Sequence, residues 1–326
     1  MKSNFGIKVI SFVLLCITFG SCHNNDNQSI TINRFDKDAM CYTLLEDSEK
    51  ATFKQKYNSV LENYINLIYP DSTISIDSKM ESFVNSNAIK LFYPKVDSVF
   101  QDNNRIANDL SVINQNLQER LGITLPHIFT AIIPYNQSII ITTEDIIIGL
   151  NHYLGADYPP YSDFPEYKRR FKIAERLKYD VCESLLRTAF PFQPQENTFL
   201  EHLIYEGTIA HALELIVPNY NTPIALKFTE DQLDWCKTNE ANIWNEIIST
   251  NILYSTNQEY KNVFFAAAPF TRNFSNSSPG ELGKWVGKQI VKKYIDETNT
   301  SIKDILLKHL YQNSQSFLIS SQYNGK

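Results

Sequence analysis

The chain contains 326 residues, of which 43% are hydrophobic, and it has 30 basic and 36 acidic side chains with a formal charge of −6. This length is enough for one large domain or two smaller ones with a substantial core. Removing residues 1–21, which contain two lysines and no acidic residue, leaves 28 basic and 36 acidic side chains, a formal charge of −8. This net negative charge argues against nucleic acid as a partner.

The N-terminus has the three regions of a secretory signal. Lys2 and Lys8 accompany the start of an apolar stretch over residues 9–18, which is followed by the tetrapeptide FGSC at 19–22. Small residues directly before a cysteine are the arrangement of a bacterial lipobox. We therefore predict a lipoprotein signal peptide over residues 1–21 and lipid attachment at Cys22. The alternative is an ordinary signal peptide with a coincidental cysteine, and it is less favoured because no competing cleavage site follows closely.

The segment 22–29 (CHNNDNQS) is short, polar and without periodicity, which predicts a flexible tether in front of a fold that begins at residue 30. Its single acidic residue, Asp26, argues against the acidic tethers expected of surface-exported lipoproteins. We therefore expect a lipid-anchored protein of the cell envelope that faces the periplasm. No second apolar run approaches the length of a membrane span, so the lipid is the expected link to the membrane.

Helical patterns dominate the chain up to about residue 122. Apolar residues recur at three-and-four spacing over 52–68, 78–100 and 103–121. A proline at position 70 ends the first pattern and Gly122 ends the third, whereas Pro94 is expected to divide the second.

The pattern then changes to β-branched runs over 128–134, 138–142 and 146–148, which predict neighbouring strands of a small sheet. The next segment, 156–165, contains three prolines and three aromatic residues and predicts a loop. Helical patterns resume after it, over 167–190, 196–217, 230–253, 279–297 and 302–313. Together these elements predict an α+β fold, predominantly helical with a small β-sheet, in a single globular domain over 30–326.

Three cysteines, Cys41, Cys182 and Cys236, remain once Cys22 is lipidated. Their number is odd and their spacing is not paired, so no disulfide framework is predicted and at most one bridge can form.

The pentapeptide CESLL at 182–186 lies in a predicted helix where a zinc metallopeptidase would carry H-E-x-x-H. Glu206 follows in the next helix, at the position of the third zinc ligand, and Glu183 has the position of the general base. Cys182 and Leu186, however, replace the two histidines, and leucine has no lone pair for a metal. We therefore expect no zinc catalysis, no bound metal and no cofactor. Taken alone, CESLL is better explained as an ordinary helical segment.

The chain as a whole resembles the GldB family of gliding-motility lipoproteins from the Bacteroidetes, a family similar to degenerate zincins. The segments that carry this resemblance are the lipobox at Cys22, Arg34-Phe35-Asp36, GLNHYLGADYPPY at 149–161, LIYEGTIAHALELIVP at 203–218, the helix with Trp235, Glu240 and Trp244, AAPF at 267–270 and PGELGKWVGKQIVKKY at 279–294. The resemblance implies a zincin-metallopeptidase-like architecture without the zinc ligands. It also implies participation in gliding-motility or related envelope machinery, with other envelope proteins as partners.

Two further groups of residues are candidate sites. His202 and Glu206 form an i,i+4 pair on one helix, and a third group from Cys182, Glu183 or His152 would complete an alternative metal or acid–base site. The default interpretation is an ordinary histidine at the surface or in a hydrogen bond. Tyr158 and Tyr161 belong to the aromatic loop. If the fold is zincin-like, these two residues, together with His152 and His202, would line its former active-site cleft as a surface for a peptide or glycan.

Gly280, Gly283 and Gly287 precede Lys288, but their spacing is wrong for a phosphate loop. We predict instead that these glycines allow two helices to pack closely.

These observations favour a non-catalytic, lipid-anchored component of envelope machinery. The alternatives are an active metal-dependent hydrolase with atypical ligands and a lipoprotein that binds a peptide or glycan.

Overall fold

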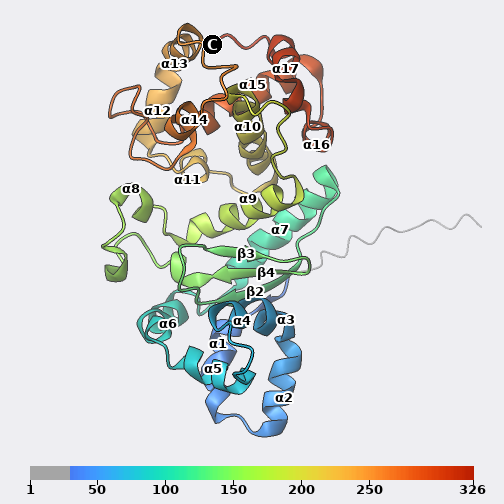
Figure 1. The fold of residues 1–326 in the computed structure, drawn as a ribbon, viewed down its shortest axis with the longest axis vertical. Helices are drawn as coiled ribbons and strands as arrows, with labels where there is room; N and C mark the ends of the chain where they lie inside the picture. Colours follow the sequence, from blue (N-terminus) through green and yellow to red (C-terminus); the bar gives the residue numbers. More distant parts are fainter. Residues whose placement is uncertain (1–29) are drawn as a thin grey trace, which may run out of the picture.

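The computed structural model describes residues 30–326. The predicted signal peptide 1–21, the tether 22–29 and Cys22 itself lie outside the described residues. Figure 1 shows that the chain is built in layers along its long axis, with N-terminal helices at one end, a small sheet in the middle and C-terminal helices at the other end. This arrangement confirms an α+β fold that is mostly helical.

The N-terminal layer is helical, as expected. Its helices are α1 (Phe35–Asp38), a 3-10 helix (Ala39–Leu44), α2 (Asp47–Lys56), α3 (Asn58–Val60), a π-helical turn (Leu61–Ile65), α4 (Asn66–Ile68), α5 (Ile76–Val84) and α6 (Asn87–Val99). The break between α5 and α6 lies at residues 85 and 86, so the prediction that Pro94 divides the helix was wrong. The Ser86 side chain caps the start of α6, and Pro94 lies inside that helix.

Helix α7 (Asn104–Leu121) lies on the side of the sheet that faces α9 and α10, as Figure 1 shows. It ends at Gly122, whose φ of +75° places it in the left-handed conformation that commonly closes a helix. The predicted end of this helix is therefore confirmed.

The sheet has four strands in the order β1-β2-β4-β3: β1 (Ile32–Asn33), β2 (His127–Ala131), β3 (Ile139–Ile141) and β4 (Asp145–Gly149). Strands β1, β2 and β4 are parallel, and β3 is antiparallel to β4. Every residue of β4 is buried, as expected for a strand covered on both faces. The three predicted strands are confirmed, whereas β1 was missed because it has only two residues.

The segment Arg34-Phe35-Asp36 holds the start of the fold against the sheet. The Asp36 side chain is fully buried and accepts hydrogen bonds from the Arg34 guanidinium and from the Thr130 hydroxyl of β2. The buried carboxylate is thus paired with a charge, as a buried ion must be.

The regular elements of the C-terminal part, from residue 150 on, are all helices. Its α-helices are α8 (Glu166–Arg169), α9 (Leu177–Ala189), α10 (Phe199–Ile216), α11 (Thr222–Leu226), α12 (Glu230–Thr238), α13 (Glu240–Ser249), α14 (Gln258–Phe265), α15 (Leu282–Thr298), α16 (Ile302–Leu307) and α17 (Ser314–Ser321). Three predicted helices are each divided. The pattern over 167–190 contains α8, a connecting segment and α9, and the pattern over 230–253 contains α12 and α13. The pattern over 302–313 contains α16 and a 3-10 helix (Leu310–Asn313).

Helices α10 and α15 cross at two glycines. A Cβ atom at Gly207 would overlap the backbone of Gly287, and a Cβ atom at Gly287 would overlap the Leu203 carbonyl group. A Cβ atom at Gly283 would meet the Phe265 ring. The prediction that the glycines of α15 allow close helix packing is therefore confirmed for Gly283 and Gly287.

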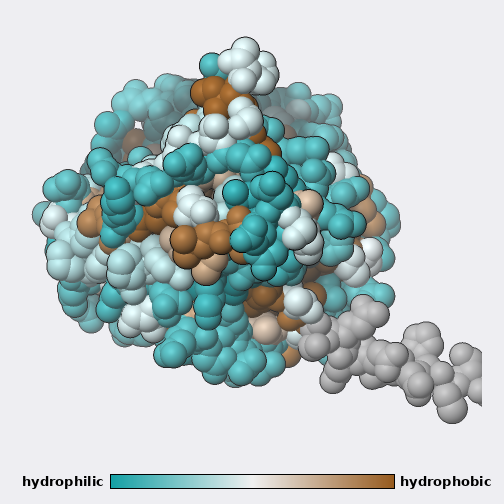
Figure 2. Space-filling model, turned by 90° about the horizontal axis from the view of Figure 1, so that it is seen from below, coloured by the Kyte–Doolittle hydropathy of each residue, from teal (hydrophilic) through white to brown (hydrophobic). Residues whose placement is uncertain are grey.

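Figure 2 looks onto the N-terminal end of the molecule and shows apolar patches between hydrophilic areas. Large exposed apolar side chains in this part of the chain are Leu44, Leu67, Ile74 and Leu91. Among the described residues, no helix is both long and apolar enough to cross a membrane. Cys41, Cys182 and Cys236 are all free.

Candidate functional site

The structure brings Glu183 of α9 and Glu206 of α10 together through Arg187. The two terminal nitrogens of the Arg187 guanidinium donate to the Glu206 carboxylate over 2.9 and 2.7 Å. Nε and one of these nitrogens also donate to the Glu183 carboxylate, over 3.2 and 2.9 Å. A guanidinium therefore lies between the two carboxylates that occupy the base and third-ligand positions of the metallopeptidase pattern.

Two further cations surround Glu183. The buried Arg176 donates to its carboxylate over 2.9 Å, and the Lys284 ammonium lies 3.6 Å from it. Burial alone would raise the pKa of Glu183, but Lys284, Arg187 and Arg176 together hold that pKa well below its ordinary value. The carboxylate is thus ionised and fully engaged in ion pairs.

The two residues at the histidine positions of the pattern are packed in the core. Cys182 and Leu186 are both 0% exposed. Burial raises the pKa of the Cys182 thiol, which keeps it in the protonated form that is a poor metal ligand. Within residues 30–326 no group of three or more His, Cys, Asp or Glu side chains is placed to hold a metal ion.

His202 makes no hydrogen bond or ion pair with the residues of this cluster in the described part of the chain. Its ring packs against Phe192 and Phe265, with centroids 4.3 and 5.5 Å apart, and one ring nitrogen hydrogen-bonds the Asn197 side chain. Its contacts are those of a packed, hydrogen-bonded histidine, the default interpretation of the sequence.

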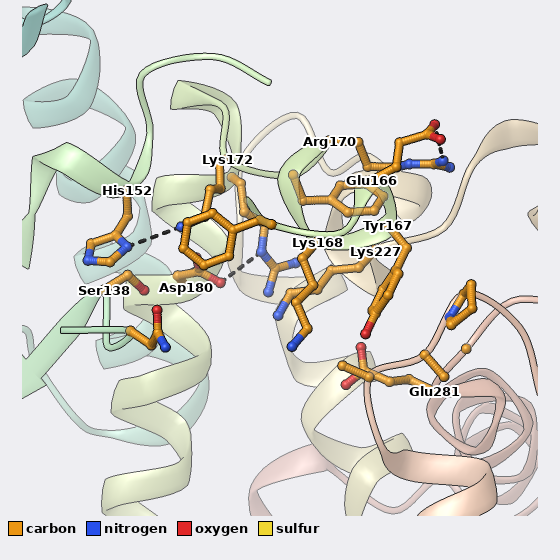
Figure 3. A pocket seen from close by; sticks show the side chains of 18 of the residues that line it. Ser138, His152, Glu166, Tyr167, Lys168, Arg170, Lys172, Asp180, Lys227 and Glu281 are labelled. Carbon is orange, nitrogen blue, oxygen red and sulfur yellow. Dashed lines mark hydrogen bonds and ion pairs between the residues drawn. The ribbon is translucent and has the colours of Figure 1, made fainter. Parts of the chain in front are cut away.

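A cleft of about 460 Å³ lies beside this cluster, in the size range of binding pockets. Figure 3 shows its lining side chains, which come from segments far apart in the sequence. Two of these segments belong to the sheet region, namely the connection between β2 and β3 and the residues after β4. The others are helical or follow helices: α8 with its connection to α9, the start of α9, the region of α11 and α12, and residues 267–269 and 280–281. Three of the segments that carry the family resemblance, 149–161, 267–270 and 279–294, therefore meet at this cleft.

The acidic side chains that line the cleft all have ion-pair partners. Glu166 pairs with Arg170 over 2.7 Å, and Asp180 pairs with the buried Arg176 over 2.8 Å. The third acidic residue, Glu281, pairs with Lys284 over 3.0 Å. These carboxylates are therefore neutralised by cations of the protein.

Three lysines of the cleft lack such partners. No carboxylate of the described residues lies within ion-pair distance of Lys168, Lys172 or Lys227. The positive charge of Arg176, together with burial, lowers the pKa of Lys227. Burial lowers the pKa of Lys172, and Lys227 lowers it further. The cleft thus holds an excess of positive charge in a protein that is acidic overall.

His152 lines one end of the cleft and is 7% exposed. Its Nδ1 accepts a hydrogen bond from the Lys172 ammonium, and its Nε2 donates to the Ile133 carbonyl, each over 3.3 Å. Burial, followed by the charge of Lys172, lowers the pKa of His152 to about 4. The imidazole is therefore neutral at physiological pH.

Of the expected cleft-lining residues, His152 lines this cleft, whereas Tyr158, Tyr161 and His202 do not. The Tyr161 side chain is buried and donates to the Asn151 carbonyl, and the Tyr158 hydroxyl donates to the Leu91 carbonyl over 2.9 Å. Both side chains thus pack the aromatic loop onto the fold. The aromatic residues that line the cleft are instead Tyr153, Phe164, Tyr167 and Phe171.

The sequence was compared with family models, curated proteins and solved structures. The family model of gliding motility protein GldB, whose name marks the family as lipoproteins, matches residues 22–325. The match begins at Cys22, the residue predicted to carry the lipid. No significant match was found among curated proteins or among solved structures. Because one family model covers nearly the whole chain, this protein belongs to the GldB family of gliding-motility lipoproteins.

Proposed function

We propose that this protein is a non-catalytic, lipid-anchored component of the gliding-motility machinery of the cell envelope. The observation that carries the non-catalytic part is the position of Arg187 between Glu183 and Glu206. The family match supports the link to gliding motility and to a lipoprotein.

The chemistry of the cluster is unsuited to metal-dependent hydrolysis. A general base must have a carboxylate available to take a proton from water. The Glu183 carboxylate is instead held by Arg176 and Arg187, and Glu206 is held by the same Arg187. A buried thiol at Cys182 and an alkyl group at Leu186 replace the two imidazoles of a zinc site.

We infer that the fold descends from a zincin-like metallopeptidase that lost its metal. Support comes from two successive helices, α9 and α10, which place Glu183 and Glu206 on either side of one cation, the Arg187 guanidinium. In such an enzyme the general base and the third ligand would lie beside the zinc ion in the same way. In this interpretation the Arg187 guanidinium supplies the positive charge that a zinc ion would have supplied.

The membrane attachment is proposed to be the lipid on Cys22, with the folded domain facing the periplasm and binding other envelope proteins. A multi-chain lipid anchor holds a folded domain at a membrane essentially permanently. A tether of eight residues would span at most about 28 Å, which keeps the domain close to the bilayer.

The test is complementation of a strain that lacks the gene, scored by colony spreading. The Glu183→Gln variant removes the proton acceptor and keeps one side-chain oxygen, which can accept from Arg187 as Oε1 does, whereas the amide group in place of Oε2 no longer accepts from Arg176. A non-catalytic component should restore spreading with this variant, whereas Cys22→Ala should fail because the domain is no longer anchored.

Loss of spreading with Glu183→Gln, in a protein that is folded by circular dichroism and present at the normal level, would favour the hydrolase instead. Metal analysis of the purified protein gives an independent check. Near-stoichiometric zinc that disappears in Glu206→Gln would contradict the proposal.

A further inference from the structure

The cleft lined by Lys168, Lys172 and Lys227 has the charge of a binding site for an anion. We propose that it binds an acidic polypeptide segment of a partner protein, with carboxylate side chains of the segment meeting these lysines. This proposal specifies what kind of partner the proposed envelope component would bind. It rests on the proposed function only in assuming that the partner is a protein.

The first argument is charge. The carboxylates of the cleft are already paired with Arg170, Arg176 and Lys284, so an added anion would not compete with them for these lysines. Elsewhere the protein is acidic, which would repel an acidic segment from most of its surface. Charges of one sign in a concave site raise both the association rate and the selectivity for the opposite charge.

The second argument is the spacing of the ammonium groups. Figure 3 shows Lys168 and Lys227 reaching into the same part of the cleft, while Lys172 ends beside His152, on the other side of Asp180. Two separate cationic positions suit two carboxylates carried by different residues of one polypeptide segment. A single phosphate group would need the three ammonium groups to converge on one point.

The third argument is that the Lys172 side chain is held in place and that the backbone is strained at Lys227. The Lys172 ammonium lies 5.0 Å from the centre of the Tyr161 ring and 4.5 Å from that of Phe164, and it donates to His152. Lys227 has a φ of +60° at the end of α11. A non-glycine residue in this left-handed region is strained, and such strain is concentrated at functional sites. Glu281, on the opposite wall of the cleft, has a φ of +52°.

The fourth argument is that the cleft also has apolar walls. Phe164, Tyr167 and Pro269 line the same cleft, so a segment that alternates acidic and apolar residues could place its carboxylates on the lysines and its apolar side chains on these walls.

The experiment uses the purified full-length lipoprotein in detergent and a labelled, end-capped peptide of alternating glutamate and alanine. Fluorescence anisotropy measures its Kd for the wild type and for the Lys168→Gln/Lys227→Gln double variant. The matched control is Lys292→Gln/Lys303→Gln, which removes the same charge from lysines outside the cleft. We expect the cleft variant to bind about tenfold more weakly or worse, and the control to stay within about twofold of the wild type.

Three results would overturn the proposal. Equal weakening in both double variants would show general charge attraction, and equal binding of a peptide with glutamine in place of glutamate would show that carboxylates are not recognised. Absence of peptide binding, with inorganic phosphate protecting Lys227 from acylation, would assign the cleft to a phosphate-bearing ligand. Because binding is measured with purified protein, its failure is distinguishable from failure of the complementation test on Glu183.

Discussion

Arg187 decides what chemistry the α9–α10 cluster can perform. One side chain donates to Glu183 and to Glu206, so two carboxylates that would otherwise repel each other become a stable ionic network. The pairing with Glu183 could be predicted from sequence, because the two residues are four apart on one helix. The pairing with Glu206 could not, because it depends on how α9 and α10 pack.

His152 should make stability depend on pH. The pKa of His152 is lowered to about 4 in the folded protein, whereas in the unfolded chain it has the ordinary histidine value of 6.5. Between these values the unfolded chain binds a proton that the folded chain does not, so the free energy of unfolding falls as the pH falls from 6.5 towards 4. At pH 4.5 the loss relative to pH 7 is about 2.5 kcal/mol from this residue alone. The effect of His152 fades above the unfolded-state pKa and is negligible above about pH 7.5.

The measurement is urea unfolding at both pH values for the wild type and for His152→Gln. Glutamine can accept from Lys172 and donate to Ile133 without titrating, so the variant should lose about 2.5 kcal/mol less between pH 7 and pH 4.5. His309→Gln is the control, since no acidic side chain lies within ion-pair distance of His309 in the described chain. An equal acid sensitivity of the wild type and His152→Gln would refute the assignment.

At the scale of elements, the crossing of α10 and α15 depends on the absence of two Cβ atoms. Gly207→Ala should therefore lower the free energy of unfolding by about 3 kcal/mol, because the methyl group would overlap the backbone of Gly287 and force the helices apart. This effect exceeds the gain of about 1 kcal/mol that alanine brings to a helix interior. Chemical denaturation measures the difference.

Gly283→Ala provides an internal comparison. Its methyl group would meet the Phe265 side chain, and a ring can shift where a backbone cannot, so this variant should be destabilised less than Gly207→Ala. Gln118→Ala, at an exposed position of α7, controls for helix propensity. If Gly207→Ala were as stable as Gln118→Ala, the close packing of the two helices would be contradicted.

The elements that could be predicted from sequence are those with a local signal. Gly122 ends α7 because glycine adopts a left-handed conformation at little steric cost. The β-branched runs became β2, β3 and β4 because their side chains fill a sheet that is covered on both sides. Strand β1 had no such signal, since a two-residue strand is defined only by its partner Ile128–Phe129.

The candidate sites follow the same rule. The positions of Glu183 and Glu206 could be predicted from a motif spread over two helices. The lysines of the cleft could not, because Lys168 and Lys172 lie near α8 and Lys227 follows α11. No periodicity links these segments, and only the tertiary fold brings them together.

At the scale of the whole molecule, the described chain is long for a single cooperative unit, since domains of more than about 250–300 residues tend to divide. Several contacts nevertheless join its layers. The Asn116 side chain of α7 donates to the Ile216 carbonyl of α10 over 2.8 Å. Lys178 of α9 donates to the Pro218 carbonyl over 2.8 Å and lies 3.4 Å from Asp109 of α7. The buried apolar residues form one continuous cluster from Phe35 to Tyr323.

These contacts predict that the domain over 30–326 unfolds in one transition, because separating the layers would expose a shared core. The chain allows a direct test, since all three tryptophans, Trp235, Trp244 and Trp285, lie in the C-terminal helices. Tryptophan fluorescence therefore reports on that part, whereas far-UV circular dichroism reports on helices of all layers. In urea the two curves should have the same midpoint. A fluorescence midpoint displaced from the dichroism midpoint, or a dichroism curve with two steps, would mean that the C-terminal helices form a domain of their own.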